Sequence, residues 1–225
     1  MQLIKPLVTF ILLLSPFNSS ADKPDGAVYL NGGESGSGVI LAHGRGKHPR
    51  WLVVNPLRKG IHEKLGYHTL SLQMPTGYGD WKAYATGFPD AYKSIKQAIS
   101  YLRDERGVRH VFLLGHSMGS RMSSAFVSKN PGHDLAGLII IGCRNSGGDP
   151  LACDGNMRDV EIPVLDIWGG KDRKDSAAAS ERGGMVSEIY KQVEIPGANH
   201  RLEGYEDDLL EAVTSWLNNH LGNSD

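Results

Sequence analysis

The sequence predicts an α/β fold with a mostly parallel sheet of six to seven strands and helices on both faces. Short apolar runs alternate with amphipathic helical patterns, as in proteins whose parallel strands are joined by crossover helices. Several runs are apolar at every position, which is typical of strands buried on both faces. The chain has 225 residues, no internal repeat and no long linker, so it fits one domain.

The first half of the chain follows this alternation element by element. A strand over residues 39–42 comes after a glycine-rich turn, and a helix over 56–65 begins with a proline in its first turn. A strand over 67–72 follows. The next helix, over 90–106, places Ile95, Ala98, Ile99 and Leu102 on one face, at the spacing i, i+3, i+4 and i+7.

The second half continues the pattern to the C-terminus. A strand over 108–114 leads into a helix that ends before Pro131. Strands over 138–141, 163–168 and 193–195 follow. The last helix carries one apolar stripe, formed by Leu209, Val213, Trp216 and Leu217.

One short motif carries the chemistry. The sequence Gly-His-Ser-Met-Gly at residues 115–119 has the form G-x-S-x-G, and it stands between a predicted strand and a predicted helix. A serine on such a sharp strand-to-helix turn presents its hydroxyl above the sheet, and the tight turn requires small neighbours. The motif in this context predicts Ser117 as a nucleophile.

A nucleophilic serine needs a base, and the base needs an orienting acid. Asp172 follows the strand over 163–168, and His200 follows the last strand. Because the carboxyl ends of parallel strands meet at one edge of the sheet, we expect both beside Ser117. Asp175 is the alternative acid, and Asp166 is less favoured because it lies inside the strand.

The nucleophile also needs donors for the oxyanion that forms on the attacked carbonyl group. The backbone N–H of Met118 lies at the positive end of its helix. The second donor is expected in the loop His-Gly-Arg-Gly at residues 43–46, where glycines allow close approach of the main chain.

In their order along the chain, these motifs resemble the landmarks of a single-domain α/β-hydrolase. The resemblance covers residues 26–221, including the loop at 43–46, the elbow at 115–119, and the segments that end in Asp172 and His200. It implies a serine esterase and assigns the second oxyanion N–H to Arg45. The segment 142–161 is too short for the cap domain that many members carry, so we expect an open site.

The N-terminus is typical of a secretory signal peptide. Lys5 precedes an apolar run over 7–14, and the segment 19–21 offers small residues for cleavage. We therefore expect a signal peptide at 1–21, a mature domain at 22–225, and a secreted or periplasmic protein. An uncleaved membrane anchor is the alternative, although the run is shorter than the ~20 residues that span a bilayer.

Two cysteines, Cys143 and Cys153, lie in the predicted mature domain. In an exported chain an even count favours a disulfide, and two buried free thiols are the alternative. No clustered histidines accompany them, so we expect no metal and no other cofactor.

Charge and composition exclude some partners and leave others open. The formal net charge is −1, so no basic excess favours nucleic acid. We expect a small-molecule or acyl substrate and no stable membrane span, and the sequence does not predict the oligomeric state. A basic cluster beside the oxyanion loop could attract an acidic substrate group or be a solvated loop; it comprises Arg45, Lys47, His48 and Arg50.

The predicted activity is hydrolysis of an ester or related acyl bond. The same triad also serves acyltransferases and peptidases, which remain alternatives. A non-catalytic binding protein that retained the fold is the alternative from another class.

Overall fold

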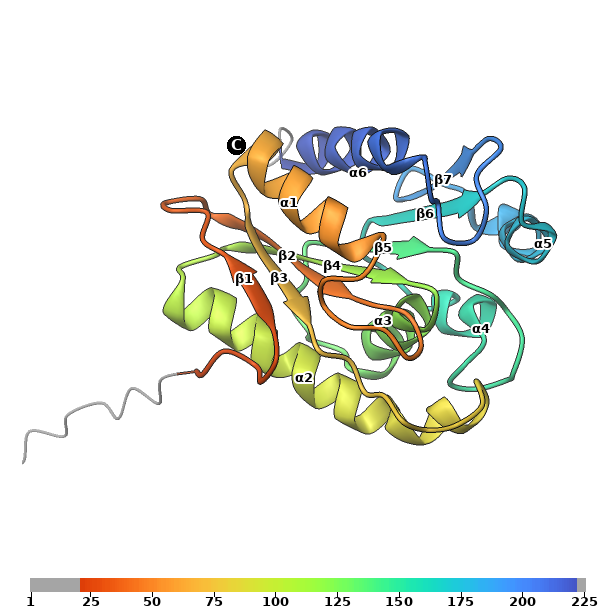
Figure 1. Cartoon of the computed structure of the whole chain (residues 1–225), viewed down its shortest axis with the longest axis horizontal. Coiled ribbons are helices and arrows are strands. Elements are labelled where there is room, and N and C mark those ends of the chain that lie inside the picture. The colour runs from red at the N-terminus through yellow and green to blue at the C-terminus, as the bar shows by residue number, and fades with distance from the viewer. Residues whose placement is uncertain (1–20, 222–225) are drawn as a thin grey trace, which may run out of the picture.

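The computed structural model of the protein describes residues 21–221. Its strands form one sheet in the order β1-β3-β2-β4-β5-β6-β7 (Figure 1). β1 pairs antiparallel with β3, and every other pairing is parallel, which confirms the predicted sheet. The strands are β1 (Val28–Leu30), β2 (Ser37–Ala42), β3 (His68–Leu72), β4 (His110–His116), β5 (Gly137–Ile141), β6 (Val164–Gly169) and β7 (Tyr190–Ile195).

Six α-helices connect or flank the strands in the described part of the chain. They are α1 (Val54–Leu65), α2 (Phe88–Ser100), α3 (Met118–Lys129), α4 (Cys153–Met157), α5 (Arg173–Glu181) and α6 (Glu206–Leu221). The helix expected over 90–106 is α2, which begins earlier and passes into a π-helical turn at Tyr101–Glu105. Two short 3-10 helices lie at Ala83–Gly87 and Gly183–Met185.

The sheet separates two apolar cores. Because side chains alternate along a strand, Phe112 and Leu114 of β4 lie in one core and Leu113 lies in the other. The first core is covered by α1 and α6, and the second by α2 and α3 (Figure 1). Burial of each such large side chain contributes ~1.5–3 kcal/mol, so the two cores hold the sheet rigidly between the helices.

Besides the five-residue α4, the strand β1 and the helix α5 have no counterpart among the sequence predictions. β1 is a three-residue edge strand, too short to show a hydrophobic period. α5 is rich in alanine and charged residues, and only Asp175, Ala178 and Ala179 are buried in it, so it shows no apolar stripe.

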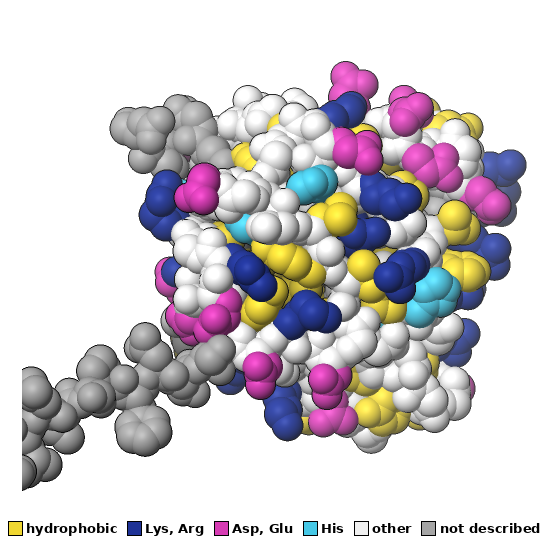
Figure 2. All heavy atoms as spheres, turned by 60° about the vertical axis from the view of Figure 1, so that its left-hand side comes forward, with side chains coloured by type: hydrophobic (Ala, Val, Ile, Leu, Met, Phe, Trp, Pro, Cys, Tyr) yellow, Lys and Arg dark blue, Asp and Glu magenta, His cyan; other side chains and the backbone are white. Residues whose placement is uncertain are grey.

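The surface carries charges of both signs. On the face shown in Figure 2, Lys and Arg side chains are interspersed with Asp and Glu and with small hydrophobic areas. Among residues 21–221, no helix is both long enough and apolar enough to cross a bilayer. The predicted signal peptide at 1–21 lies, apart from its last residue, outside the described residues.

Candidate active site

The turn between β4 and α3 holds Ser117 in a strained conformation. Its φ of 57° and ψ of −113° lie outside the regions that a non-glycine residue ordinarily adopts. Such strain is found at functional sites where the surrounding structure enforces it. The elbow also requires Gly119, because a Cβ there would collide with the carbonyl oxygens of Ala42 and His43.

A continuous hydrogen-bonded chain begins at the Ser117 hydroxyl. The Ser117 Oγ–H donates to Nε2 of His200 at 2.9 Å. The Nδ1–H of His200 donates to Oδ2 of Asp175 at 2.6 Å. Gly142 leaves room for this pair, since a Cβ there would lie 3.1 Å from both Asp175 Oδ2 and His200 Nδ1. The three side chains thus have the arrangement of a Ser-His-Asp triad.

In the structure His200 is hydrogen-bonded to Asp175, the alternative acid, and not to the predicted Asp172. Asp172 is the N-cap of α5, and its Oδ1 accepts hydrogen bonds from the backbone N–H groups of Lys174 and Asp175, both at 3.0 Å. Asp is among the preferred N-cap residues because its carboxylate satisfies first-turn N–H groups. The acid that contacts His200 therefore lies one helical turn later, at the alternative position. Asp166 lies away from the triad and pairs with Arg182.

Arg144 joins the two aspartates. Its Nε donates to Asp175 Oδ1 at 2.7 Å, and its Nη2 donates to both carboxylate oxygens of Asp172 at 3.1 Å. Burial opposes ionisation of Asp175. The hydrogen bonds and charges of His200 and Arg144 outweigh this effect and hold the pKa of Asp175 below its usual value. Asp175 is therefore an ionised acceptor for the imidazole at neutral pH.

The loop after β2 lies against the elbow, as expected for an oxyanion site. A Cβ on Gly44 would lie 3.3 Å from Cβ of Ser117, so the main chain passes close to the nucleophile. His43 fixes this loop: its Nδ1–H donates to the Gly44 carbonyl at 2.9 Å, and its Nε2 accepts from the Met74 N–H at 3.0 Å. Burial lowers the pKa of His43, so it serves here as a neutral structural residue.

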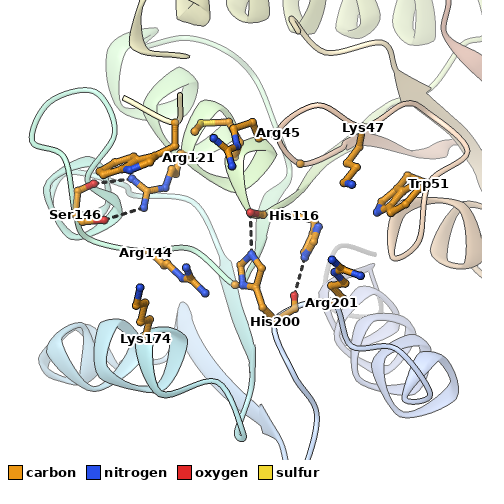
Figure 3. A pocket seen from close by; sticks show the side chains of 15 residues that line it. Arg45, Lys47, Trp51, His116, Arg121, Arg144, Ser146, Lys174, His200 and Arg201 are labelled. Carbon is orange, nitrogen blue, oxygen red and sulfur yellow. Dashed lines mark hydrogen bonds between the residues drawn. The ribbon is translucent and has the colours of Figure 1, made fainter. Parts of the chain in front are cut away.

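His116, the residue before Ser117, forms a hydrogen bond with the backbone of His200. Its Nε2–H donates to the backbone carbonyl of His200 at 2.9 Å (Figure 3). Burial, reinforced by the neighbouring His200, lowers the pKa of His116 to about 4. His116 is thus neutral near pH 7 and can orient His200 without competing for its proton.

A pocket of about 530 Å³ opens over Ser117. The elbow supplies His116, Ser117 and Met118, and the segment after β2 supplies Gly44, Arg45 and Lys47. Two tryptophans, Trp51 and Trp81, form apolar walls. The remaining lining residues are Arg121, Gly142, Arg144, Ser146, Lys174, His200 and Arg201.

The basic cluster and a group of aromatic residues at 78–88 each lie partly in the pocket and partly outside it. Of the basic cluster, Arg45 and Lys47 line the pocket, whereas His48 and Arg50 do not. Of the aromatic residues at 78–88, Trp81 lines the pocket, whereas Tyr84 and Phe88 are buried in the core.

Three side chains near the triad have the composition of a metal site, but a guanidinium already lies among them. Ligand atoms of Asp172, Asp175 and His200 lie within 4.8 Å of one another. Arg144 donates to both carboxylates, and His200 donates to Asp175. The two carboxylates therefore already have a positively charged partner in Arg144.

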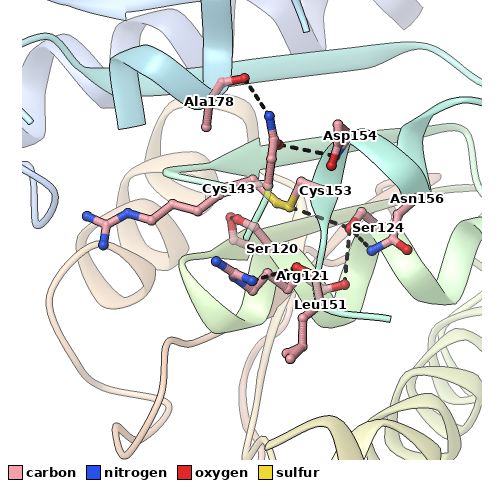
Figure 4. Close-up of a disulfide and its surroundings, with 12 residues drawn as sticks. Ser120, Arg121, Ser124, Cys143, Leu151, Cys153, Asp154, Asn156 and Ala178 are labelled. Carbon is pink, nitrogen blue, oxygen red and sulfur yellow. Dashed lines mark hydrogen bonds between the residues drawn. A yellow bond between two sulfur atoms is a disulfide. The ribbon is translucent and has the colours of Figure 1, made fainter. Parts of the chain in front are cut away.

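Cys143 and Cys153 form a disulfide with a Cα–Cα distance of 6.0 Å (Figure 4). Both residues are buried. The bridge closes the loop between β5 and α4, which carries Arg144 and Ser146 into the pocket. Between β5 and β6 the chain forms only the five-residue α4, so no cap domain is inserted there.

Known structures share this architecture. Est1E from Butyrivibrio proteoclasticus, solved with ferulic acid bound, is 18% identical over 88% of this chain and 95% of its own, with a TM-score of 0.71. The putative α/β hydrolase ATU1826 from Agrobacterium tumefaciens is 19% identical over 87% of this chain and 91% of its own, with a TM-score of 0.69. XC6422 from Xanthomonas campestris, an α/β serine hydrolase without lid, is 18% identical over 80% and 82%, with a TM-score of 0.60.

At these identities the likeness establishes the fold. No curated protein matches the chain in sequence. A family model described as "Protein of unknown function (DUF3530)" matches residues 79–219, more than half of the chain and including the whole proposed triad. The chain therefore has the α/β-hydrolase fold and belongs to the DUF3530 family.

Proposed function

We propose that the protein is a serine hydrolase that cleaves an ester or a related acyl bond. One observation carries this proposal. Ser117, held in a strained elbow at the floor of a pocket, donates to His200, and His200 donates to the buried carboxylate of Asp175. A neutral imidazole in this position activates a serine hydroxyl that is otherwise a weak nucleophile at neutral pH.

The reaction takes place in two half-reactions. Ser117 Oγ attacks the carbonyl carbon while its proton passes to Nε2 of His200. The bond to the alcohol then breaks, and His200 protonates the departing oxygen, which leaves an acyl group on Ser117. Water attacks this acyl group, gives a proton to His200, and releases the acid as His200 returns the proton to Ser117.

The other residues have supporting roles. The backbone N–H groups of Met118 and Arg45 stabilise the oxyanion, because Met118 begins α3 and its N–H lacks an intrahelical acceptor. Asp175 holds the His200 tautomer and stabilises the imidazolium as it forms. Arg144 holds Asp175 in place and keeps it ionised.

The test is active-site labelling combined with turnover. Wild-type protein should react with a fluorophosphonate probe at Ser117 and hydrolyse 4-nitrophenyl acetate. Ser117→Ala should abolish labelling and lower kcat by about 10⁴-fold or more, because members of a triad act as a unit. Ser146→Ala is the matched control, since Ser146 lines the same pocket and lies outside the hydrogen-bonded chain. Product analysis with an added alcohol separates hydrolysis from acyl transfer.

A Ser117→Ala variant that is folded and still labels and turns over like the wild type would contradict the proposal. Absence of labelling and turnover in the folded wild-type protein would favour the non-catalytic alternative.

We also propose that the protein is exported and begins at Asp22 after cleavage of residues 1–21. The disulfide between Cys143 and Cys153 supports this, because such bonds persist in oxidising compartments. Intact mass of protein from the periplasm or the medium tests it. The expected mass is that of residues 22–225 with the bridge closed, and a retained Met1 would contradict cleavage.

A further inference from the structure

The pocket over Ser117 is lined by cations and by no acidic residue. Six of its 15 lining residues are Lys or Arg, and none is Asp or Glu. The whole chain is nearly balanced, with 24 Lys and Arg against 25 Asp and Glu. The positive lining is therefore a local property of the pocket. It is formed by Arg45, Lys47, Arg121, Arg144, Lys174 and Arg201.

Arg121 is the most informative of these residues, because it is only 6% exposed. Its Nη1 donates to the carbonyl oxygens of Ser146 and Leu151, both at 2.6 Å, and its Nη2 donates to Ser146 Oγ at 3.2 Å. The guanidinium also lies 5.3 Å from the ring centroid of Trp81. Within residues 21–221, no carboxylate oxygen lies within 4 Å of it. Burial and the charge of Arg144 lower its pKa to about 10, so it remains charged at neutral pH.

A second buried arginine shows what Arg121 lacks. Arg182 is 1% exposed and forms two hydrogen bonds to the carboxylate of Asp166, at 2.9 and 3.0 Å. A buried charge is costly unless an opposite charge accompanies it. The described part of the chain provides that counter-charge for Arg182 and omits it for Arg121 and for Arg58, a buried arginine of α1. Of these two, Arg121 lines the pocket over Ser117 and Arg58 does not. An anionic group of a bound ligand would supply the counter-charge of Arg121.

The cations are placed beside the reacting atoms. In Figure 3, Arg121, Arg144 and Lys174 lie on one side of the His200 ring, and Lys47 and Arg201 lie on the other. Arg144 is already paired with two aspartates. Among the described residues, Lys174 and Arg201 have no such ion pair, and both are exposed at the pocket. With Arg121 they leave a net positive potential around the position of the scissile bond.

We infer that the substrate is an ester that carries an anionic group, such as a carboxylate, close to the scissile bond, and that Arg121, Lys174 and Arg201 select it. This inference rests on the proposed hydrolase function and specifies its substrate class. The anionic group neutralises Arg121 and approaches Lys174 or Arg201, while Trp81 contacts the apolar part of the substrate. A neutral ester of the same shape leaves the pocket charge uncompensated.

The test uses pairs of esters that differ only in a carboxylate and its carboxamide. In the first pair the charge is on the acyl side: the mono-4-nitrophenyl ester of glutaric acid is compared with the 4-nitrophenyl ester of glutaric acid half-amide. In the second pair the charge is on the alcohol side: the butyrate ester of 3-hydroxybenzoic acid is compared with the butyrate ester of 3-hydroxybenzamide. At low ionic strength we expect the carboxylate of at least one pair to have about tenfold higher kcat/KM or more. The preference should shrink as salt rises.

Matched variants locate the effect. Lys174→Gln and Arg201→Gln should each lower the preference by about two- to fivefold, the range expected for one partly exposed cation. Arg173→Gln is the control, because Arg173 is a neighbouring exposed cation in the first turn of α5 that does not line the pocket. It should change the preference by less than about twofold. Lys174 and Arg201 keep the test valid even if an Arg121 variant, which loses three loop contacts, does not fold.

A binding measurement distinguishes failure of this inference from failure of the proposed function. Calorimetric binding of the same ester pairs to Ser117→Ala requires no turnover. Tighter binding of the carboxylates, weakened by Lys174→Gln, would support the inference even in a protein without hydrolase activity. Equal binding and equal kcat/KM within both pairs, or a preference that none of the pocket variants changes, would overturn it and leave the hydrolase proposal intact.

Discussion

Two buried aspartates of this protein each face an arginine, and only one of them is connected to the pocket. Asp166 is 0% exposed and is surrounded by Arg182, Tyr190 and Gln192, all of which donate to it. Asp175 is 1% exposed, yet its partners Arg144 and His200 are 28% and 25% exposed. The first group is a closed network that stabilises the sheet edge. The second leaves one carboxylate oxygen for an imidazole that can exchange protons with a substrate.

A single segment joins the two networks. The carbonyl of Cys143 and the side-chain oxygen of Asn145 accept hydrogen bonds from Nη1 of Arg182, at 2.9 and 2.6 Å. Arg144, between them, donates to Asp175 instead. Alternate residues of this segment are therefore fixed by the closed network and by the site. The closed network thus supports Arg144, which is bound to Asp175, the proposed catalytic acid.

The largest expected effect on stability comes from opening the closed network. Asp166→Asn leaves the charge of Arg182 buried without a counter-charge and should lower the unfolding free energy by about 3–5 kcal/mol. Urea denaturation measures the loss, and the turnover of the remaining folded protein should stay within about tenfold of wild type. Asp159→Asn, on the exposed surface, is the control and should change stability by less than about 0.5 kcal/mol. An unchanged stability of Asp166→Asn would show that the network contributes nothing.

A smaller effect is expected from the buried histidine beside the triad. The pKa of His116 is about 4 in the folded state, against an ordinary value near 6.5 in the unfolded chain. The unfolded state therefore binds the proton more readily between these values. Stability should be constant above pH ~6.5 and fall by up to about 3 kcal/mol as the pH drops to ~4.

His116→Gln tests this, because the Gln amide can still donate to the His200 carbonyl but cannot titrate. Denaturation at a series of pH values should give a shallower loss for His116→Gln than for wild type. Equal slopes for the two proteins would contradict the assignment. His43, which is also buried and neutral, should account for part of the slope that remains.

The disulfide should give the smallest of these stability effects. Cys143→Ala combined with Cys153→Ala removes a bridge with a sequence separation of 10. Chain-entropy reasoning predicts a loss of about 2–3 kcal/mol in unfolding free energy. Because the two alanines occupy buried positions, they also change the packing. The unfolding free energy of wild-type protein that is reduced while unfolded and then refolded gives the effect of the bridge without new side chains. A loss in neither experiment would mean that the closed network alone fixes the segment at 143–145.

The sequence predicts most of the fold because several buried strands contain a continuous apolar run and most crossover helices are amphipathic. Ser117 and His200 are predicted to lie together because each follows a strand at the same edge of the sheet, and the structure places them within hydrogen-bond distance. The sequence predicts Asp172 as the acid because it follows a strand, and it does not predict α5, whose alanines and charges form no apolar stripe. An Asp before an alanine-rich run is a helix-capping signal, and it would have indicated that Asp172 was already engaged by the backbone.

The sequence does not predict that Arg121 and Arg144 line the pocket, and the reason differs from that for the acid. Arg121 stands in the middle of a helix and Arg144 in a loop, and neither position implies a partner. Whether a buried arginine meets a carboxylate, as Arg182 does, or faces a pocket, as Arg121 does, depends on contacts between segments far apart in the chain. Such contacts leave no local pattern.

The most direct test of the central claim compares the two aspartates of α5. Asp175→Asn should lower kcat by about 10⁴-fold with little change in KM or in the fold, because an Asn amide favours the wrong His200 tautomer. Asp172→Asn keeps an N-cap side chain and should lower kcat by less than about tenfold. Both variants are measured on 4-nitrophenyl acetate, with circular dichroism to confirm folding. The opposite result, a large loss for Asp172→Asn and near wild-type activity for Asp175→Asn, would contradict the Ser117–His200–Asp175 triad.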